Sequence, residues 1–407
     1  MDKENSGYNV SGRPYVKVQN GRILLDPGPI VRETGLPGVR LDFNCGVRLE
    51  IPEGNWHVRI TDQDTMAVLL DADVSGQSVG TGKFFYINYL VELWKDGEKL
   101  LTHHMNLAGK NVRFLFPIGV LGDTVSFIPA VEEFRRKHGC RPYCIVAKVH
   151  TEFLAAAYPE IVFLPEEMEV PECYASYYLW TSTDKNDLPF DYRQTGFARC
   201  IPLMLGLGDR EFRPVFKPCP ERLIREPYVC IAVKASAHRK LWNNPKGWDI
   251  TVDYLKSLGY RVLCIDRNRV EKRGDFEIGI PPGAEDFTGD LPIQQRIDLL
   301  GHADFFVGLS SGLSWLAWGC GIPVVMISGF TLPFAEFYNP YRVINYHACN
   351  GCGNDNSLEE RSPDYHYCAR HGGTDRAFEC TRYISPGYVC KTIDRLMADH
   401  GLPRLKE

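Results

Sequence analysis

The chain has 407 residues, of which 44% are hydrophobic and 24% charged, a composition typical of a globular protein with two or three domains. A formal net charge of -5 excludes a protein that binds nucleic acid over its whole surface. No apolar run reaches about 18 residues, so no membrane-spanning helix is predicted. The polar start MDKENSGYNV predicts no secretion signal. We therefore expect a cytoplasmic protein.

Residues 1–108 predict a β-rich domain, either a small sandwich or a barrel. Short runs such as NWHVRI and FFYINYLVELW are rich in β-branched and aromatic residues. Turn-forming residues separate these runs, including the pair Asp96 and Gly97. Nothing in this region indicates catalysis, so we expect it to pack on the next domain, cover an acceptor groove or make subunit contacts.

Residues 109–220 predict a first Rossmann-like domain, because strands begin to alternate with helices. A strand over residues 112–117 is followed by a loop with Gly119 and Gly122 and then by a helix. The apolar face of that helix is Val125, Ile128, Val131 and Phe134. CIVAKV and EIVFL predict further strands, whereas CYASYYLW fits either a strand or a helix.

Asp123 lies in the glycine turn between the first strand and its helix. One interpretation is a helix N-cap, since an aspartate there accepts hydrogen bonds from free backbone amides. The other is a general base, because such a turn lies beside whatever binds at the carboxyl end of the sheet. The pattern alone does not choose between them.

A Pro-rich segment over residues 212–227 predicts a linker, and residues 221–345 predict a second Rossmann-like domain. Its strands are the runs YVCIAV, YRVLCID, DFFVGL and IPVVMIS, with helical segments between them. Two doubly wound domains joined by a linker enclose a cleft at the carboxyl ends of both sheets. The fold class is therefore α/β.

Two segments of the second domain could contact a phosphorylated ligand. The first, KASAHRKLWNNPKGW, offers Lys240 as a point charge for a leaving diphosphate, with Lys234 and Lys246 as alternatives. The second places a small polar turn, residues 310–312, before a helix, so that backbone amides can approach phosphate oxygens. The lone histidines His103, His104 and His238 fit structural or substrate-orienting roles. The sequence contains neither G-x-G-x-x-G nor a P-loop, which argues against a dehydrogenase or a P-loop NTPase.

Fourteen cysteines are many for a protein without a secretion signal, and five of them lie between Cys349 and Cys390. The pair in CNGC and two later single cysteines can supply four thiolates to one tetrahedral metal. This predicted ligand set is Cys349, Cys352, Cys368 and Cys380. Spacing alone favours a structural zinc in a finger over residues 346–385, before a C-terminal helix over residues 386–407. Cys390 fits that helix, and His347, His366 and His371 are alternative ligands.

GVLGDTVSFIPAVEEFRRKHGC and SSGLSWLAWGCGIPVV resemble two glycine-rich turns of the lipopolysaccharide ADP-heptose heptosyltransferases. Together with HRKLWNNPKGW and the cysteine-rich tail, they more closely resemble the bacterial autotransporter heptosyltransferases. That resemblance implies a GT-B enzyme that transfers heptose from ADP-glycero-manno-heptose to serine hydroxyls of an autotransporter protein, with inversion. The first Rossmann-like domain then binds the acceptor and the second the nucleotide sugar.

The resemblance also implies roles for particular residues. Asp123 matches the catalytic aspartate, and Lys240 the lysine that contacts phosphate. The donor site is then formed by Gly122, Thr124, Lys240, Ser310, Ser311 and Gly312. The finger is expected to hold one iron per subunit in place of zinc, and the chain to form a large homo-oligomer, a dodecamer by the resemblance.

Two other functions fit parts of the sequence. A lipopolysaccharide core heptosyltransferase has the same donor, but many such enzymes have an acidic residue where this chain has Ser310 and Ser311. The finger and the β-rich start also argue against it. A non-catalytic metal-finger assembly protein, whose Rossmann-like domains only bind nucleotide, is the alternative outside enzymes.

Overall fold

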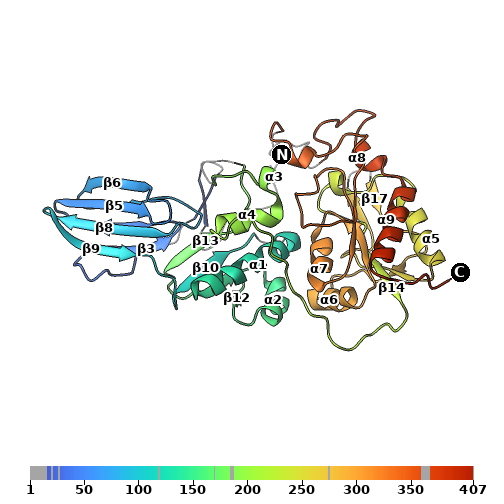
Figure 1. Cartoon of the computed structure of the whole chain (residues 1–407), viewed down its shortest axis with the longest axis horizontal. Coiled ribbons are helices and arrows are strands. Elements are labelled where there is room, and N and C mark those ends of the chain that lie inside the picture. Colours follow the sequence, from blue (N-terminus) through green and yellow to red (C-terminus); the bar gives the residue numbers. More distant parts are fainter. Residues whose placement is uncertain are drawn as a thin grey trace. The chain divides into compact units, whose positions relative to one another are not determined.

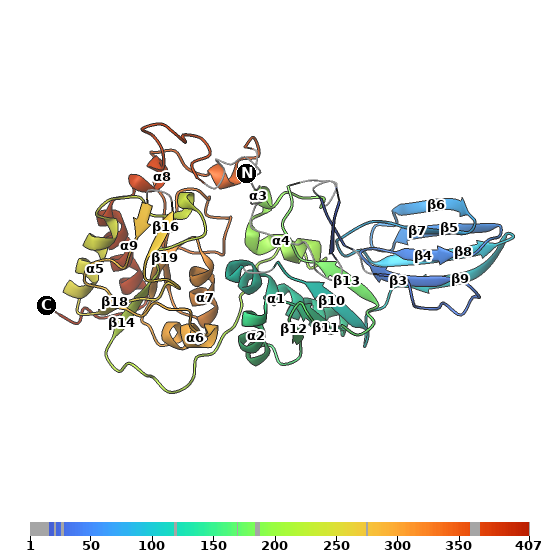
Figure 2. The same cartoon turned by 180° about the vertical axis from the view of Figure 1, so that it is seen from behind.

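The computed structural model describes residues 16–19, 22–25, 28–117, 120–168, 170–183, 188–273, 276–358 and 367–406. Gly119 and His366 of the predicted sites lie outside the described residues. The chain divides into two compact units, and each is described by itself below (Figures 1 and 2). The first takes the described parts of Met1–Gly119, Ala130–Asp191 and Arg199–Arg210, and the second those of Val120–Pro129, Tyr192–Ala198 and Glu211–Glu407.

A four-stranded antiparallel sheet in the order β6-β5-β8-β9 forms one part of the first unit (Figure 2). Its strands are β5 (Trp56–Asp62), β6 (Val68–Val74), β8 (Tyr89–Lys95) and β9 (Glu98–His104). Alternate residues of β5 and β8 are buried, as a sheet with one solvated face requires. Asp96 and Gly97 both have positive φ, which confirms the predicted tight turn between β8 and β9.

The larger sheet of the first unit has seven strands in the order β12-β11-β10-β13-β3-β4-β7. They are β3 (Arg40–Asn44), β4 (Arg48–Ile51), β7 (Gln77–Gly80), β10 (Asn111–Leu115), β11 (Arg141–Ile145), β12 (Val162–Leu164) and β13 (Ala175–Tyr178). The five strands from β12 to β3 pair in parallel, and β4 and β7 continue antiparallel. Three strands from residues 1–108 therefore extend the parallel sheet. The ambiguous run CYASYYLW contains the strand β13.

Helices connect three of the parallel strands: α1 (Leu121–His138) lies between β10 and β11, and η1 (Lys148–His150) with α2 (Thr151–Ala157) between β11 and β12. The helices α3 (Tyr192–Thr195) and α4 (Phe197–Met204) follow β13 in the chain. The predicted apolar face of α1 is confirmed, because Val125, Ile128, Val131 and Phe134 are all fully buried. This burial fixes the rotation of α1 about its own axis.

The second unit contains a six-stranded, fully parallel sheet in the order β18-β15-β14-β19-β20-β21. Its strands are β14 (Tyr228–Ile231), β15 (Arg261–Cys264), β18 (Glu285–Asp286), β19 (Phe306–Leu309), β20 (Val324–Ile327) and β21 (Arg342–Val343). Counted along this sheet, the order is 3-2-1-4-5-6, that of doubly wound nucleotide-binding domains. Every residue of β14, β19 and β20 is buried, as expected for a sheet covered on both faces.

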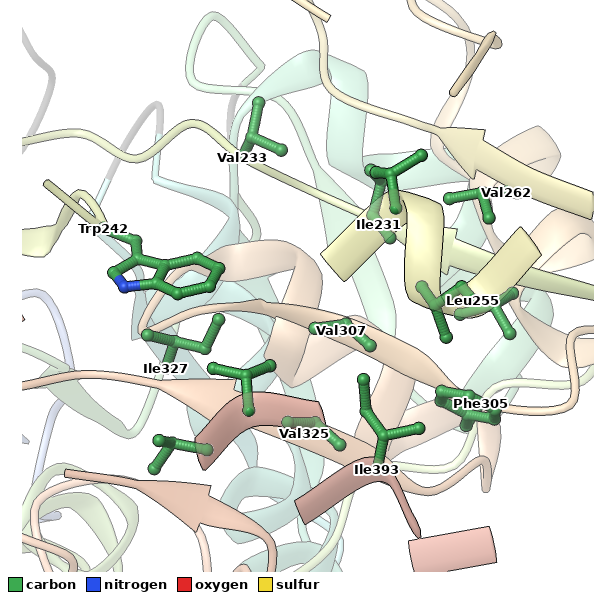
Figure 3. Close-up of a cluster of buried hydrophobic side chains, with 14 of the residues drawn as sticks. Ile231, Val233, Trp242, Leu255, Val262, Phe305, Val307, Val325, Ile327 and Ile393 are labelled. Atoms are coloured by element: carbon green, nitrogen blue, oxygen red, sulfur yellow. The ribbon is translucent and has the colours of Figure 1, made fainter. Parts of the chain in front are cut away.

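Helices α5 (Gly247–Ser257) and α9 (Pro386–Asp399) cover one face of this sheet, and α6 (Ile293–Gly301) and α7 (Gly312–Cys320) the other (Figure 1). Figure 3 shows the hydrophobic core on the side of α5 and α9, where Leu255 of α5 and Ile393 of α9 pack against Val307 and Val325. The remaining elements are the hairpins β1 (Val16–Gln19) with β2 (Arg22–Leu25) and β16 (Glu271–Arg273) with β17 (Phe276–Ile278), and the short helices η2 (His238–Lys240), η3 (Cys352–Asn354) and α8 (Glu379–Arg382). No helix in the described part of the chain is both long and apolar enough to cross a membrane.

Candidate functional site

The strand order of the second unit places a topological switch point between β14 and β19. From β14 the chain continues to β15 on one side, and from β19 to β20 on the other. Ligands of doubly wound domains bind outside the carboxyl ends of the strands at such a point. The segments that begin at Ala232 and Ser310 directly follow these two strands. The two segments that the sequence predicts to contact phosphate therefore begin at neighbouring strands, at the same edge of the sheet.

Ser311 is the N-cap of α7, and its backbone is extended, with φ -147° and ψ 169°. Its hydroxyl does not cap the helix. The Ser311 Oγ is buried and has no hydrogen-bond partner among the residues that the structure describes. An unused hydroxyl beside the free amides and partial positive charge of a helix N-terminus is an arrangement that suits a phosphate.

Gly312, the first residue of α7, lies close to the start of α1. A Cβ atom on Gly312 would lie 3.0 Å from the backbone nitrogen of Gly122, closer than side chains normally pack. Residues 120–129 and 312 belong to the same unit, so this approach lies within one body. The two glycines therefore allow the N-termini of α1 and α7 to lie side by side.

Asp123 is the third residue of α1 and is 7% exposed. The N-cap interpretation is therefore wrong for this residue, since the helix begins before it. A carboxylate in the first turn still interacts favourably with the helix dipole. Thr124, the next residue, is fully buried, and its hydroxyl donates to the Val120 carbonyl oxygen at 3.2 Å. Thr124 thus stabilises the first turn of α1.

The three candidate lysines have different surroundings. Lys234 is buried, and its Nζ donates to the backbone oxygens of Asn268 at 2.7 Å and Arg269 at 3.3 Å. The side chain of Lys246 is 75% exposed, with its Nζ 3.6 Å from the Asp249 carboxylate. Lys240 is partly buried, its Nζ 5.7 Å from the ring centre of Phe330. Lys240 thus differs from Lys234, which is buried against a neighbouring loop, and from Lys246, which is exposed.

A buried polar network lies behind the Ser310 turn, and the sequence analysis missed it. The Ser310 hydroxyl donates to Glu336, which also accepts from Thr331 at 2.7 Å and from the Arg342 guanidinium at 2.6 Å. The side chains of Arg342 and Glu336 are only 4% and 6% exposed. Arg342 also donates to Thr331 Oγ1 at 2.6 Å. No motif links these positions, which meet only through the pairing of β20 with β21.

The four predicted metal ligands, Cys349, Cys352, Cys368 and Cys380, line one cavity of about 10 Å³. That is room for a single water-sized atom. Two donors approach its sulfurs: the Phe378 amide is 3.4 Å from the Cys368 Sγ, and the Arg370 guanidinium 3.6 Å from the Cys349 Sγ. Such donors stabilise thiolates bound to a metal. Four thiols around one small cavity are a donor set that suits a single metal ion.

Burial opposes ionisation of two of these thiols, those of Cys352 and Cys380. It raises the pKa of Cys380 to about 12, and the neighbouring thiols add to the rise. Burial also raises the pKa of Cys352, and the positive charge of Arg239 partly offsets this rise. A bound cation would stabilise several thiolates in so small a cavity.

A smaller ligand group overlaps this cavity. One donor atom each of Cys349, His371 and Glu379 lie within 4.8 Å of one another. The Glu379 carboxylate already accepts from the Cys349 amide at 3.0 Å and from Arg376 at 2.7 Å, and Arg376 lowers its pKa. Glu379 therefore orients the loop of Cys349. Cys390 belongs to α9 and is not among the residues that line the cavity.

Comparisons with known proteins agree with these features. Residues 35–97 match the model of the N-terminal domain of glycosyltransferase TibC, and residues 202–367 that of glycosyltransferase family 9 (heptosyltransferase). The chain is 45% identical over 384 residues to the autotransporter heptosyltransferase BAHTCr of Citrobacter rodentium, covering 92% of this chain and 93% of that protein.

TibC of Escherichia coli, an autotransporter heptosyltransferase, is 42% identical over 378 residues, covering 92% of this chain and 93% of TibC. The crystal structure of dodecameric, iron-containing TibC in complex with ADP-D-β-D-heptose superimposes with a TM-score of 0.87 and 41% identity, over 92% of this chain and 100% of that one. BimC of Burkholderia thailandensis, described as an inactive autotransporter heptosyltransferase, is 34% identical over 372 residues, covering 90% of this chain and 88% of BimC.

Proposed function

This chain belongs to the autotransporter heptosyltransferases, and we propose that it transfers heptose from ADP-heptose to serine hydroxyls of an autotransporter passenger protein. The observation that carries the proposal is its identity to these enzymes over nearly the whole chain, with a family match to residues 35–97 of the β-rich start. None of the fourteen cysteines, all of which the structure describes, forms a disulfide; this fits a reducing compartment, so we assign the reaction to the cytoplasm.

The ADP moiety is assigned to the switch point of the second unit. The Ser311 hydroxyl and the first amides of α7 are suited to donate hydrogen bonds to the diphosphate oxygens. Lys240 follows the neighbouring strand β14 and supplies a cation that neutralises the charge of the leaving ADP. Gly122, Thr124, Ser310 and Gly312 complete the proposed donor site by keeping the two helix starts close and fixed.

Asp123 is assigned the role of general base. A serine hydroxyl is a poor nucleophile at neutral pH, so a carboxylate within hydrogen-bond reach takes its proton as its oxygen attacks C1 of the heptose. The new bond joins C1 to the serine oxygen, and the broken bond joins C1 to the β-phosphate oxygen. The proton stays on Asp123 and the electron pair leaves with ADP. A single displacement inverts the configuration at C1.

The four cysteines are assigned to one structural metal. Cys349, Cys352, Cys368 and Cys380 would hold iron, since the related TibC is iron-containing, with zinc as the alternative. When bound, the ion ties together a finger whose sequence is too polar to form its own core. We also propose a large homo-oligomer, since TibC is dodecameric.

A non-catalytic role is the alternative that a specific observation favours, because BimC is described as inactive. The two proposals differ in what Asp123 does. If the chain is an enzyme, Asp123→Asn should lower the rate of heptose transfer by about 10²–10⁴-fold, the usual contribution of a general base. A lipopolysaccharide core enzyme would instead modify a lipid acceptor.

The test measures transfer and donor binding on the same preparations. Purified wild-type chain and Asp123→Asn are incubated with ADP-heptose and either a passenger protein or lipid core, and ADP affinity is measured by calorimetry. We expect a heptose mass on the passenger for the wild type, almost none for Asp123→Asn, and equal ADP affinity for both. Transfer by Asp123→Asn at the wild-type rate would remove Asp123 from this role.

A further inference from the structure

We infer that Arg239 is a positioning residue that couples the metal site of the cysteine finger to the donor site, so that metal occupancy sets the affinity for ADP. The cysteine finger here means the described residues 346–358 and 367–385. The inference rests on the proposed function, because it assigns the ADP moiety to the turn that contains Lys240. It gives the finger a role in substrate binding beyond holding its own loop.

The first observation is that each residue of η2 contacts the finger or the segment beneath it. The ring of His238 lies 5.5 Å from that of Tyr367 and 6.3 Å from that of Phe378, centre to centre. Arg239 is 7% exposed and lines the same cavity as the four cysteines. Lys240 is the next residue, so the proposed diphosphate ligand and a wall of the metal cavity occupy one short turn.

The second observation is that the chain after η2 is attached to the part of the finger around Cys380. The Trp242 indole nitrogen donates to the Ile384 carbonyl oxygen at 3.0 Å. Asn243 Nδ2 donates to Thr381 Oγ1 at 2.9 Å, and Asn244 Nδ2 to the Arg382 carbonyl oxygen at 3.1 Å. These acceptors lie in or directly after α8, which contains Cys380. A displacement of Cys380 therefore moves the anchors of η2.

The third observation concerns Phe330, which lies between the two sites. The guanidinium carbon of Arg239 is 5.0 Å from its ring centre, and the Lys240 Nζ 5.7 Å from the same ring. The Phe330 carbonyl oxygen accepts from the Gly353 amide at 2.7 Å, one residue after Cys352. The neighbouring Gly329 packs so closely on Cys380 that a Cβ there would lie 2.5 Å from the Cys380 carbonyl oxygen. Arg239 and Lys240 thus both lie near the ring of Phe330, and the segments that contain Cys352 and Cys380 hold Phe330 in place.

Charge explains why the metal affects Arg239. Four thiolates around a divalent or trivalent ion form a cluster of net negative charge, and buried charges require partners. Arg239 and Arg370 both line the cavity, and Arg370 lies 3.6 Å from the Cys349 Sγ and pairs with Asp355 at 2.6 Å. Arg239 lines the cavity that would hold this cluster, so loss of the ion changes the charge beside it and loosens the turn that contains Lys240.

The coupling is tested by two equilibrium titrations of the full chain. ADP affinity is measured by calorimetry for the metal-loaded and metal-depleted protein, and metal affinity by competition with a chelator with and without saturating ADP. We expect metal depletion to weaken ADP binding about tenfold, within the usual range of coupling between two sites. Since linkage is reciprocal, ADP should strengthen metal binding by the same factor.

Variants separate coupling from simple structural damage. Arg239→Met should bind ADP about tenfold more weakly even when loaded with metal, and depletion should weaken it little further, because the coupled effects are not additive. Arg239→Lys, which keeps the charge, should recover much of the affinity. Arg395→Met is the control, since Arg395 is exposed on α9 and donates to the Pro340 carbonyl oxygen.

Equal ADP affinities in the loaded and depleted wild type would overturn the inference, as would wild-type affinity in metal-loaded Arg239→Met. If Arg239→Met does not fold, the wild-type titrations alone decide. A chain that binds ADP with this coupling but transfers no heptose would refute the proposed function and leave the coupling standing. A wild-type chain that does not bind ADP would refute both.

Discussion

The buried ion pair of Arg342 and Glu336 leads to the sharpest stability prediction. Glu336→Gln keeps the shape of the side chain, but it removes the charge opposite Arg342 and turns one acceptor into a donor. Breaking a buried pair by removing one partner costs about 3–5 kcal/mol. These side chains are 4% and 6% exposed, so solvent screens the loss little.

Thermal unfolding followed by calorimetry measures the effect. For a domain of about 200 residues, a loss of about 3 kcal/mol lowers the Tm by about 6–12 °C. Asp290→Asn is the matched control, because it makes the same chemical change in an ion pair whose side chains are 73% and 75% exposed, and it should cost about 0.5 kcal/mol or less. Equal shifts in the two variants would refute the argument from burial.

The same network links stability to function. Because the Ser310 hydroxyl donates to Glu336, Glu336→Gln should also raise the KM for ADP-heptose more than it lowers kcat. Replacing both partners, with Glu336→Leu and Arg342→Met, should cost less than the sum of the single changes, since no buried charge is left alone. Additive losses in the double variant would show that the two side chains act independently.

Three further predictions concern single residues. Lys240→Met should lower kcat/KM for heptose transfer by about 10²-fold through loss of charge at the leaving diphosphate, whereas Lys246→Met, at an exposed position, should leave steady-state kinetics unchanged. Cys380→Ser should lose most of the metal measured by elemental analysis, while Cys390→Ser should retain it, because Cys390 does not line the cavity. Burial lowers the pKa of His150 to about 4, below its unfolded value near 6.5, so the unfolded state binds the proton first as pH falls. The free energy of unfolding should therefore decrease from about pH 6.5 to about pH 4, with up to about 3 kcal/mol from His150. Urea titrations of His150→Phe should show a smaller slope, and the remaining slope should come in part from His138, whose pKa burial also lowers to about 4.

Local patterns in the sequence were sufficient for much of the fold. Periodicity placed the apolar face of α1, and the pair Asp96 and Gly97 predicted the turn between β8 and β9. The alternation of strands and helices predicted the doubly wound sheet of the second unit. Each of these features is encoded within a few consecutive residues, where side-chain period and backbone preference act directly.

Features that depend on distant residues were not predicted. The strand β3 joins β13 in parallel, although more than a hundred residues separate them in the chain. The burial of Glu336 against Arg342, and the attachment of η2 to the finger, likewise arise only when separate segments meet. No local pattern encodes such pairings. In the sequence, a single glutamate that will be buried cannot be told from a glutamate on the surface, and a loop that will attach to the finger cannot be told from a solvent-exposed loop.

The site was predicted unevenly for the same reason. The sequence predicted that the Ser310 turn and the segment of Lys240 follow buried strands, and the strand order places both strands at the switch point. The choice among three lysines needed the contacts of Lys234 and Lys246, which sequence does not contain. The four cysteines were found because their spacing is itself the pattern, and they line one cavity.

The central claim, transfer of heptose to serine, is tested most directly by mass spectrometry of a passenger protein after incubation with the purified chain and ADP-heptose. The account predicts whole heptose additions localised to serine residues, dependent on ADP-heptose and absent with Asp123→Asn. A passenger that stays unmodified under conditions in which the chain binds ADP, or heptose found on lipid core in its place, would contradict it.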